Sequence, residues 1–156
     1  MEQRTTTGYS LKRGEGTRIN FRGTTMTLKV AGESTEGAYS LIEMLHPPEV
    51  GPALHIHPRG AEAFYVLNGT YMIRSGDRIH TATPGDFVFI PQNVPHRYQS
   101  GAQGGTVLVI SPAGLEQYFA EAAEVLKNGP LTWEIEREIA RRHGQEFLEK
   151  LKHWGQ

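Results

Sequence analysis

The chain has 156 residues, with 16 Lys and Arg against 17 Asp and Glu, so its net charge is −1 when His is neutral. This length suggests one domain, and the interspersed charges leave no basic field that would attract nucleic acid or an anionic membrane surface, so we expect a small molecule or a protein as partner. The absence of cysteine excludes disulfides, thiolate metal sites and a cysteine nucleophile.

The first part of the chain, residues 1–24, predicts an N-terminal arm with one edge strand over residues 17–21. This segment is polar and lacks the apolar region of a signal peptide. No stretch of the sequence approaches the roughly 20 apolar residues that are needed to cross a bilayer. We therefore expect a cytoplasmic protein that does not enter a membrane.

Short apolar runs separated by glycine and proline extend from residue 25 to residue 110, a pattern typical of many short strands joined by tight turns. Asn68-Gly69 predicts a two-residue hairpin turn, because a type I′ turn needs positive φ at both central positions and these residues tolerate it. The predicted strands cover residues 25–30, 38–45, 53–57, 62–67, 70–74, 78–81, 87–90, 96–99 and 106–110, with a loop over 100–105.

After residue 110 the apolar residues change to helical spacing. The pattern predicts one helix that begins near Ser111-Pro112 and stops at residues 128–130, and a second helix over residues 132–142. Residues 145–156 are expected to form a short helix or to fray. Strands followed by helices predict an all-β barrel or sandwich over residues 25–110 with a C-terminal helical extension over residues 111–156.

Four side chains with metal-binding chemistry stand out in the predicted barrel. His55 and His57 are two residues apart on one strand, so their rings point to the same face. Glu62 begins the next strand after a tight turn, and His96 opens a later strand. Imidazole and carboxylate donors together suit a divalent first-row metal ion. The spacing therefore predicts a metal site.

Two segments resemble the sequence motifs of the cupin superfamily. Residues 51–69 (GPALHIHPRGAEAFYVLNG) are similar to the first motif, and residues 85–96 (GDFVFIPQNVPH) to the second. Residues 110–119 also resemble the helical extension of quercetinase-like single-domain cupins. The resemblance implies a double-stranded β-helix, also called a jelly-roll barrel, in which one metal ion is bound by His55, His57, Glu62 and His96. Fe(II) is the first choice, with Mn, Ni, Co, Cu or Zn as alternatives.

The sequence departs from the cupin pattern at two places. Asn93 occupies the position where the second motif usually has glycine, and asparagine is the residue that best tolerates the left-handed conformation after glycine. We therefore expect the turn before His96 to be retained. The asparagine that many germins carry after the last histidine has no counterpart near Gln99 and Ser100, which disfavours a germin-like oxalate enzyme.

Strand alternation predicts which side chains surround the metal. If Glu62 points inward, so do Phe64 and Val66, and the predicted hairpin would place Tyr71 opposite Val66 and Ile73 opposite Phe64. Tyr98 shares the face of His96. Tyr71 and Tyr98 are therefore candidates for orienting a ligand oxygen, and the resemblance implies that Glu62 can act as a general base.

The remaining histidines are interpreted as structural or exposed. We expect His46 in a loop, His80 on a strand surface, and His143 and His153 near helix ends. Arg59 lies in the turn between His57 and Glu62, where it is either a solvated charge or a group that attracts an anionic substrate.

Four protein ligands on a six-coordinate metal leave two positions open, for a substrate that chelates through two oxygens or for one substrate oxygen and O2. The leading hypothesis is a metal-dependent dioxygenase that acts on a small aromatic or enolic compound. The alternatives are an isomerase, epimerase or lyase that uses the metal as a Lewis acid, and a non-enzymatic module that binds a small ligand or sugar. We also expect a homodimer formed through the N-terminal strand or the C-terminal helices, because exposed sheet edges tend to pair.

Overall fold

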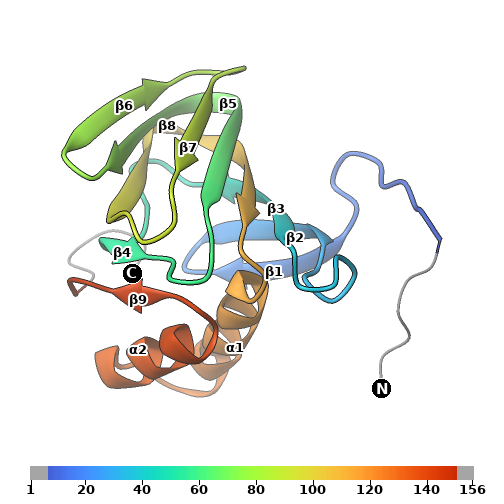
Figure 1. The fold of residues 1–156 in the computed structure, drawn as a ribbon, viewed down its shortest axis with the longest axis vertical. Coiled ribbons are helices and arrows are strands. Elements are labelled where there is room, and N and C mark those ends of the chain that lie inside the picture. Colours follow the sequence, from blue (N-terminus) through green and yellow to red (C-terminus); the bar gives the residue numbers. More distant parts are fainter. Residues whose placement is uncertain (1–6, 151–156) are drawn as a thin grey trace.

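The computed structural model describes residues 7–150, so what the sequence predicts for residues 1–6 and 151–156 lies outside the described residues. Within residues 7–150 the chain forms nine β-strands and two α-helices (Figure 1). The strands are β1 Thr17–Phe21, β2 Thr24–Val30, β3 Ser40–His46, β4 His55–Ile56, β5 Glu62–Ser75, β6 Arg78–Ala82, β7 Phe87–Ile90, β8 His96–Ser111 and β9 Glu146–Phe147. The helices are α1 Leu115–Asn128 and α2 Trp133–Arg142.

All strand pairs are antiparallel, and they connect into one strongly bent sheet. The order β1-β2-β3-β8-β4-β9 forms one path, and β5 joins it by pairing with β8 while also pairing with β6 and β7. Helices α1 and α2 lie together at one end of this sheet, next to β9 (Figure 1). The fold is thus all-β with two C-terminal helices, as the sequence predicts. None of the helices in residues 7–150 is long and apolar enough to cross a membrane.

The interior of the bent sheet is filled by alternate residues of its strands. Val88 and Ile90 of β7 face the core, whereas their neighbours Phe87 and Phe89 are exposed, which decides the face that the sequence left open. The inward positions predicted for Phe64, Val66, Tyr71, Ile73 and Tyr98 are all confirmed by burial.

The predicted hairpin at Asn68-Gly69 is wrong. β5 continues through these residues as a single 14-residue strand, with register shifts against β8 on both sides of them. Gly69 has φ 75°, but Asn68 is absent from the residues with positive φ, and a type I′ turn needs both. Gly69 is therefore part of a β-bulge and not of a turn. The bulge shifts the alternation, so that Tyr71 faces inward opposite Ser100 of β8 and not opposite Val66.

The predicted loop over residues 100–105 is also wrong, because these residues belong to the 16-residue strand β8. β5 and β8 approach closely here. A Cβ atom on Gly105 would lie 2.6 Å from the ring of Tyr71, and one on Gly69 would collide with the backbone of Gly104. The glycines that suggest a loop in the sequence are needed instead so that two paired strands and a buried tyrosine can fit together.

Helix α1 begins later than predicted. Ser111 ends β8 and its hydroxyl lies 2.9 Å from that of Ser40, so the helix starts only at Leu115. The buried carboxylate of Glu116 accepts hydrogen bonds from the backbone N–H groups of Gly32 and Gly114, which satisfies donors near the start of the helix. Helix α2 agrees closely with the prediction, and Thr132 caps it by accepting from the backbone N–H of Ile135.

The segment after α2 forms a strand where the sequence predicted a short helix or a frayed end. Glu146 pairs with Ile56 and Phe147 with His55, so that β9 extends the sheet beside β4. The backbone N–H of Leu148 also donates to the carbonyl of Leu54 at 2.8 Å. The C-terminal extension is thereby attached to the strand that carries the first predicted ligand.

Candidate metal centre

The four side chains predicted as metal ligands come together inside the sheet. His55 lies on β4 and pairs in register with His96 on β8, while Glu62 is the first residue of β5. His57 follows β4 by one residue, on the same side as His55. All four residues are buried.

The loop before His96 is fastened to the strand that carries the other histidines. Asn93 adopts φ 65°, the left-handed conformation expected for it, and its backbone N–H donates to the carbonyl of His57 at 3.2 Å. The side-chain amide of Gln92 donates to the carbonyl of Pro58 at 2.6 Å. These bonds hold the loop in the place that brings His96 to the cluster, so asparagine substitutes for glycine here.

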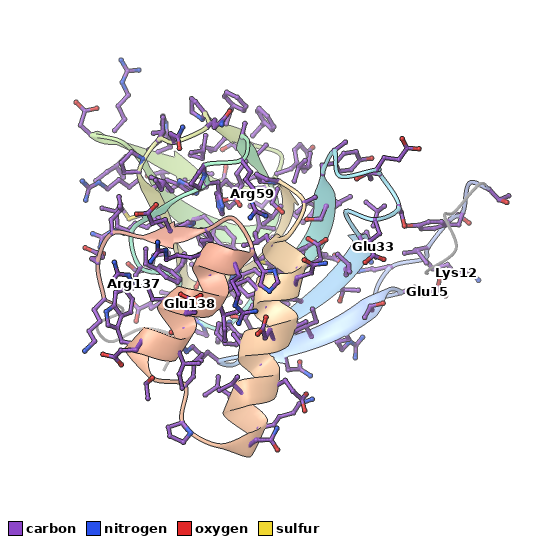
Figure 2. All side chains as sticks on the ribbon, turned by 60° about the horizontal axis from the view of Figure 1, so that its bottom comes forward. Lys12, Glu15, Glu33, Arg59, Arg137 and Glu138 are labelled. Carbon is purple, nitrogen blue, oxygen red and sulfur yellow. The ribbon has the colours of Figure 1, made fainter. Side chains whose placement is uncertain are left out.

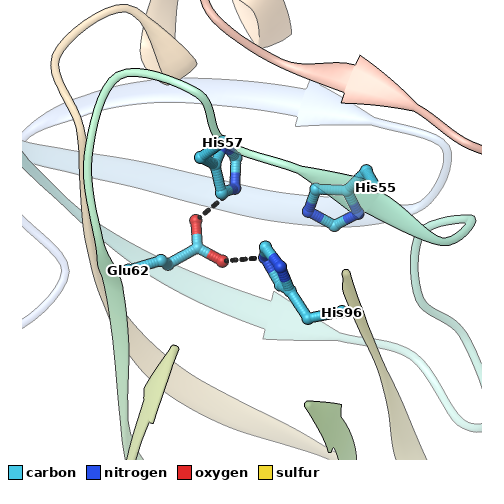
Figure 3. A group of neighbouring side chains, drawn as sticks. All are labelled: His55, His57, Glu62 and His96. Atoms are coloured by element: carbon cyan, nitrogen blue, oxygen red, sulfur yellow. Dashed lines mark hydrogen bonds and ion pairs between the residues drawn. The ribbon is translucent and has the colours of Figure 1, made fainter. Parts of the chain in front are cut away.

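The ligand atoms of the four residues lie within 4.8 Å of one another. Glu62 is central: its Oε2 is 3.0 Å from His57 Nε2 and its Oε1 is 3.2 Å from His96 Nε2 (Figure 3). Opposite ligands of an octahedral ion at typical metal–nitrogen distances of about 2.0–2.1 Å lie roughly 4.2 Å apart. The cluster therefore has the dimensions that a first-row ion requires.

Hydrogen bonds to the backbone orient the imidazole rings. His55 Nδ1 lies 2.8 Å from the carbonyl oxygen of Ala53, and His96 Nδ1 lies 2.8 Å from that of Val94. A carbonyl can only accept, so each Nδ1 carries a proton. Each Nε2 therefore faces the cluster, where its lone pair would be the donor to a metal ion. His57 makes a backbone hydrogen bond to Gly144. Metal-bound histidines are typically held in this way.

One buried atom of the cluster lacks a hydrogen bond. His57 Nε2 is close to the Glu62 carboxylate, yet among the described residues nothing forms a well-directed hydrogen bond with it. A buried nitrogen without such a partner is costly, whereas a cation between the ring and the carboxylate would satisfy both. The donor set and this atom fit a bound metal ion.

The charges of the cluster affect one another strongly. Burial alone would raise the pKa of Glu62, but the neighbouring His57 and His96 hold it below its ordinary value. Burial opposes a charge on His57 as well, yet the neighbouring Glu62 raises its pKa. Burial and the two other histidines lower the pKa of His55. A carboxylate that stays ionised and a neutral imidazole are the forms that bind metals.

A second polar cluster lies beside the first, and one of its members was missed. His46 was expected in a loop, but it is the last residue of β3 and is buried. Its Nδ1 lies 2.8 Å from the hydroxyl of Tyr71, and its Nε2 lies 3.2 Å from that of Tyr98. Alternation along β3 could have revealed it, because Ile42 and Met44 share its face.

A cavity of about 70 Å³ borders the metal-type cluster at His55 and Glu62. Tyr98 and His46 also line it, whereas Tyr71 lies behind His46 and does not. The other side of the cavity is formed by the end of β1 and the C-terminal extension, through Phe21, Arg22, Leu115, Tyr118, Phe119, Trp133, Glu136, Gln145 and Phe147. Its walls are therefore mainly apolar and aromatic.

Arg59 lies beside the ends of the helices (Figure 2). It is exposed, and its Nη2 donates to the carbonyl of Arg142 at 3.2 Å, as a cation at a helix C-terminus does. His80 is exposed on β6, as predicted, and His143 follows the end of α2, where its Nε2 is 2.7 Å from Glu121. His153 lies outside the described residues.

Comparison with known proteins agrees with this description. Residues 41–111 match the family model of the cupin domain. The resemblance to the cupin superfamily is confirmed, and the strands have the jelly-roll fold expected from the two motifs.

Among relatives of known activity, the chain is 26% identical over 112 residues to quercetin 2,3-dioxygenase of Bacillus subtilis. The match covers 71% of this chain and 33% of that enzyme, so the chain spans about a third of the relative's length. A solved RmlC-like cupin from Shewanella frigidimarina superposes with a TM-score of 0.60 at 18% identity, covering 71% of this chain and 96% of that one. The polyketide cyclase RemF of Streptomyces resistomycificus gives 0.57 at 23% identity, covering 68% and 80%. At these identities the two structures show the fold alone.

Proposed function

We propose that this cupin is an enzyme that binds one divalent first-row metal ion, Fe(II) in the first place, and catalyses dioxygenation of a small aromatic or enolic substrate. His55, His57, Glu62 and His96 would hold the ion. The observation that carries the proposal is the convergence of three imidazole nitrogens and one carboxylate within 4.8 Å, next to a cavity with aromatic walls. The distant likeness to quercetin 2,3-dioxygenase supports the reaction class.

Each residue near the metal would have its own role in the reaction. A redox-active ion with open positions supplies the chemistry that brings O2 and an electron-rich substrate to react. Glu62 borders the cavity and could take a proton from a substrate hydroxyl. Tyr98 also lines the cavity, and its hydroxyl is held near His46 at 3.2 Å, so it could orient a substrate oxygen. The buried position of Tyr71 gives it the role of supporting His46.

The decisive experiment is reconstitution without oxygen, followed by addition of O2. Protein loaded with Fe(II), Mn(II), Co(II), Ni(II) or Cu(II) would be mixed with a flavonol, a catechol or a β-diketone, and O2 uptake would be recorded. We expect uptake with at least one metal and loss of uptake in Glu62→Ala. Metal-loaded protein that consumes no O2 with any of these compounds would exclude the dioxygenase.

The same protein separates the two alternative functions. Turnover of a substrate with Zn(II) and without oxygen would indicate Lewis-acid isomerase, epimerase or lyase chemistry. A rise in melting temperature with a metabolite or sugar, without turnover under any metal, would indicate a binding module.

We also propose that the chain forms a homodimer. Besides the N-terminal strand and the C-terminal helices expected from the sequence, an exposed apolar face of the sheet is a candidate for the contact, and it is the one that the variants below test. Phe87 and Phe89 of β7 are 60% and 55% exposed, and Tyr65, opposite Phe87 on β5, is 44% exposed. Ile110 on β8 continues this face. Aromatic residues gathered on one face favour a self-complementary interface. Light scattering should give twice the 17.4 kDa chain mass, and Phe87→Glu combined with Phe89→Glu should halve it; a mass near 17.4 kDa for the parent would refute dimerisation.

A further inference from the structure

The amide of Gln145 is unusual among the polar groups around the cavity. Gln145 follows α2, is only 3% exposed, and lines the same cavity as His55 and Glu62. Its Oε1 is buried, and within residues 7–150 it has no hydrogen-bond partner. Leaving a buried acceptor unpaired costs about 1–3 kcal/mol, so a group from a ligand would be favoured there.

The charged side chains on the helical side of the cavity are already paired. Arg22 donates to both carboxylate oxygens of Glu136 at 2.8 and 2.7 Å, and the hydroxyl of Tyr118 donates to the same carboxylate at 2.7 Å. This network is electrically neutral and offers no free charge to a ligand. Near the barrel interior, both ring nitrogens of His46 are occupied by tyrosine hydroxyls. Among the polar groups on this side, Gln145 is thus the one whose buried oxygen acceptor is left without a partner in residues 7–150.

The backbone around Gln145 is firmly attached to the metal-type cluster. The N–H of Gln145 donates to the carbonyl of Ala140 at 2.9 Å, and the preceding Gly144 bonds to the ring of His57. Two residues further on, Phe147 pairs with His55 across β9 and β4. The backbone that carries the amide is thus held in a constant position relative to the ligand histidines, as the support of a specificity-determining group must be.

From these contacts we infer that Gln145 is a specificity-determining residue, whose Oε1 accepts a hydrogen bond from a hydroxyl or N–H of the substrate. The inference rests on the proposed metal site, because the substrate would reach the metal with one part and Gln145 with another. The satisfied Arg22–Glu136 pair and the apolar walls of the cavity indicate a second property of the substrate, its lack of charge on this side. The substrate is small, mainly apolar and uncharged away from its metal-binding oxygens, and it carries one donor on that side.

The test compares matched probes on Zn(II)-loaded protein, in which Zn(II) does not support oxidation. The probes are catechol, which offers two metal-binding oxygens alone, and its 3- and 4-hydroxymethyl derivatives, which add one donor. Their dissociation constants would be measured by calorimetry for the parent, for Gln145→Met, and for Gln117→Met, the same change at an exposed position of α1. Melting temperatures without ligand and zinc contents would be measured on the same samples.

We expect the parent to bind at least one hydroxymethyl derivative roughly tenfold more tightly than catechol, as one buried hydrogen bond allows. Gln145→Met should bind catechol and the hydroxymethyl derivatives equally well, with unchanged zinc content and an unchanged or higher melting temperature. Gln117→Met should behave as the parent. A zinc-loaded parent without this preference, a preference that survives in Gln145→Met, or a Gln145→Met protein that melts lower without ligand would overturn the role of Gln145. A parent that binds no zinc would instead overturn the proposed metal site, and this inference with it.

Discussion

Two buried polar clusters lie close together in this protein, and they use similar side chains for different ends. In the first, His55, His57 and His96 converge on the carboxylate of Glu62. In the second, His46 lies between the hydroxyls of Tyr71 and Tyr98. Both clusters are buried, and both lie on inward-facing positions of the sheet.

The clusters differ in what satisfies the imidazole nitrogens. In the first cluster, Nδ1 of His55 and Nδ1 of His96 bond to backbone carbonyls. Their Nε2 atoms therefore point into the cluster, toward one another and toward the carboxylate of Glu62. Both nitrogens of His46 are taken by phenols, and burial lowers its pKa from 6.5 to about 4, so it stays neutral at pH 7. A metal site needs free lone pairs and an anion, and only the first cluster offers them. The partners of a buried histidine thus indicate its role better than the residue type does.

The strongest test of this contrast is the metal content of variants from the two clusters. His57→Ala should lower metal affinity by at least about 100-fold, because it removes a direct ligand and not only a supporting contact. Elemental analysis of protein purified without chelators would measure it. His46→Phe and the exposed His80→Ala should retain the metal of the parent. Full metal content in both the parent and His57→Ala would disprove the ligand assignment.

The second test uses pH, with metal-free protein so that ligand binding does not interfere. His46 has a lowered pKa in the folded state, so the unfolded chain binds a proton more readily. The stability that depends on neutral His46 is complete above about pH 6.5 and is lost as pH falls toward 4, with about 2 kcal/mol lost by pH 5. Urea unfolding of the parent and of His46→Gln at pH 7 and pH 5 would measure the difference. An equal loss in both proteins would contradict this account, since the other titrating groups are shared.

The smallest expected effect concerns the hydroxyl that holds His46. Tyr71→Phe removes the group 2.8 Å from His46 Nδ1 and leaves that nitrogen without its partner. We expect a loss of about 1 kcal/mol in the free energy of unfolding, with no change in metal content. Tyr65→Phe, on the exposed face of the same strand, is the matched control and should be neutral. Loss of metal in Tyr71→Phe would show that the two clusters act as one unit.

Much of the fold follows from local patterns in the sequence. The strands over 17–21 and 87–90 and the helix after Thr132 have the predicted bounds or differ by one residue, because alternation, helical spacing and caps are local signals. The wrong predictions are at glycines, because a glycine can mark a turn or loop but can equally permit a bulge or a close contact inside a strand. Asn68-Gly69 and the glycines of residues 100–105 suggest a turn and a loop, yet they permit a bulge and a close approach between β5 and β8. Only the partner strand distinguishes these cases.

The candidate ligand set is the feature that the sequence by itself determined best. His55 and His57 share a strand face, a short turn brings Glu62 beside them, and the second motif supplies His96; the structure gathers the same four side chains. Sequence patterns also predicted that Tyr71 and Tyr98 face inward.

Tertiary structure alone decided what surrounds these residues. It brought His46 between the two tyrosines, and it attached β9 to the strand of His55. It also placed Gln145 at the cavity. These contacts join residues that are far apart in the chain, and no local pattern encodes them. They arise from pairing between distant strands: β3 lies beside β8, and β9 of the C-terminal extension lies beside β4.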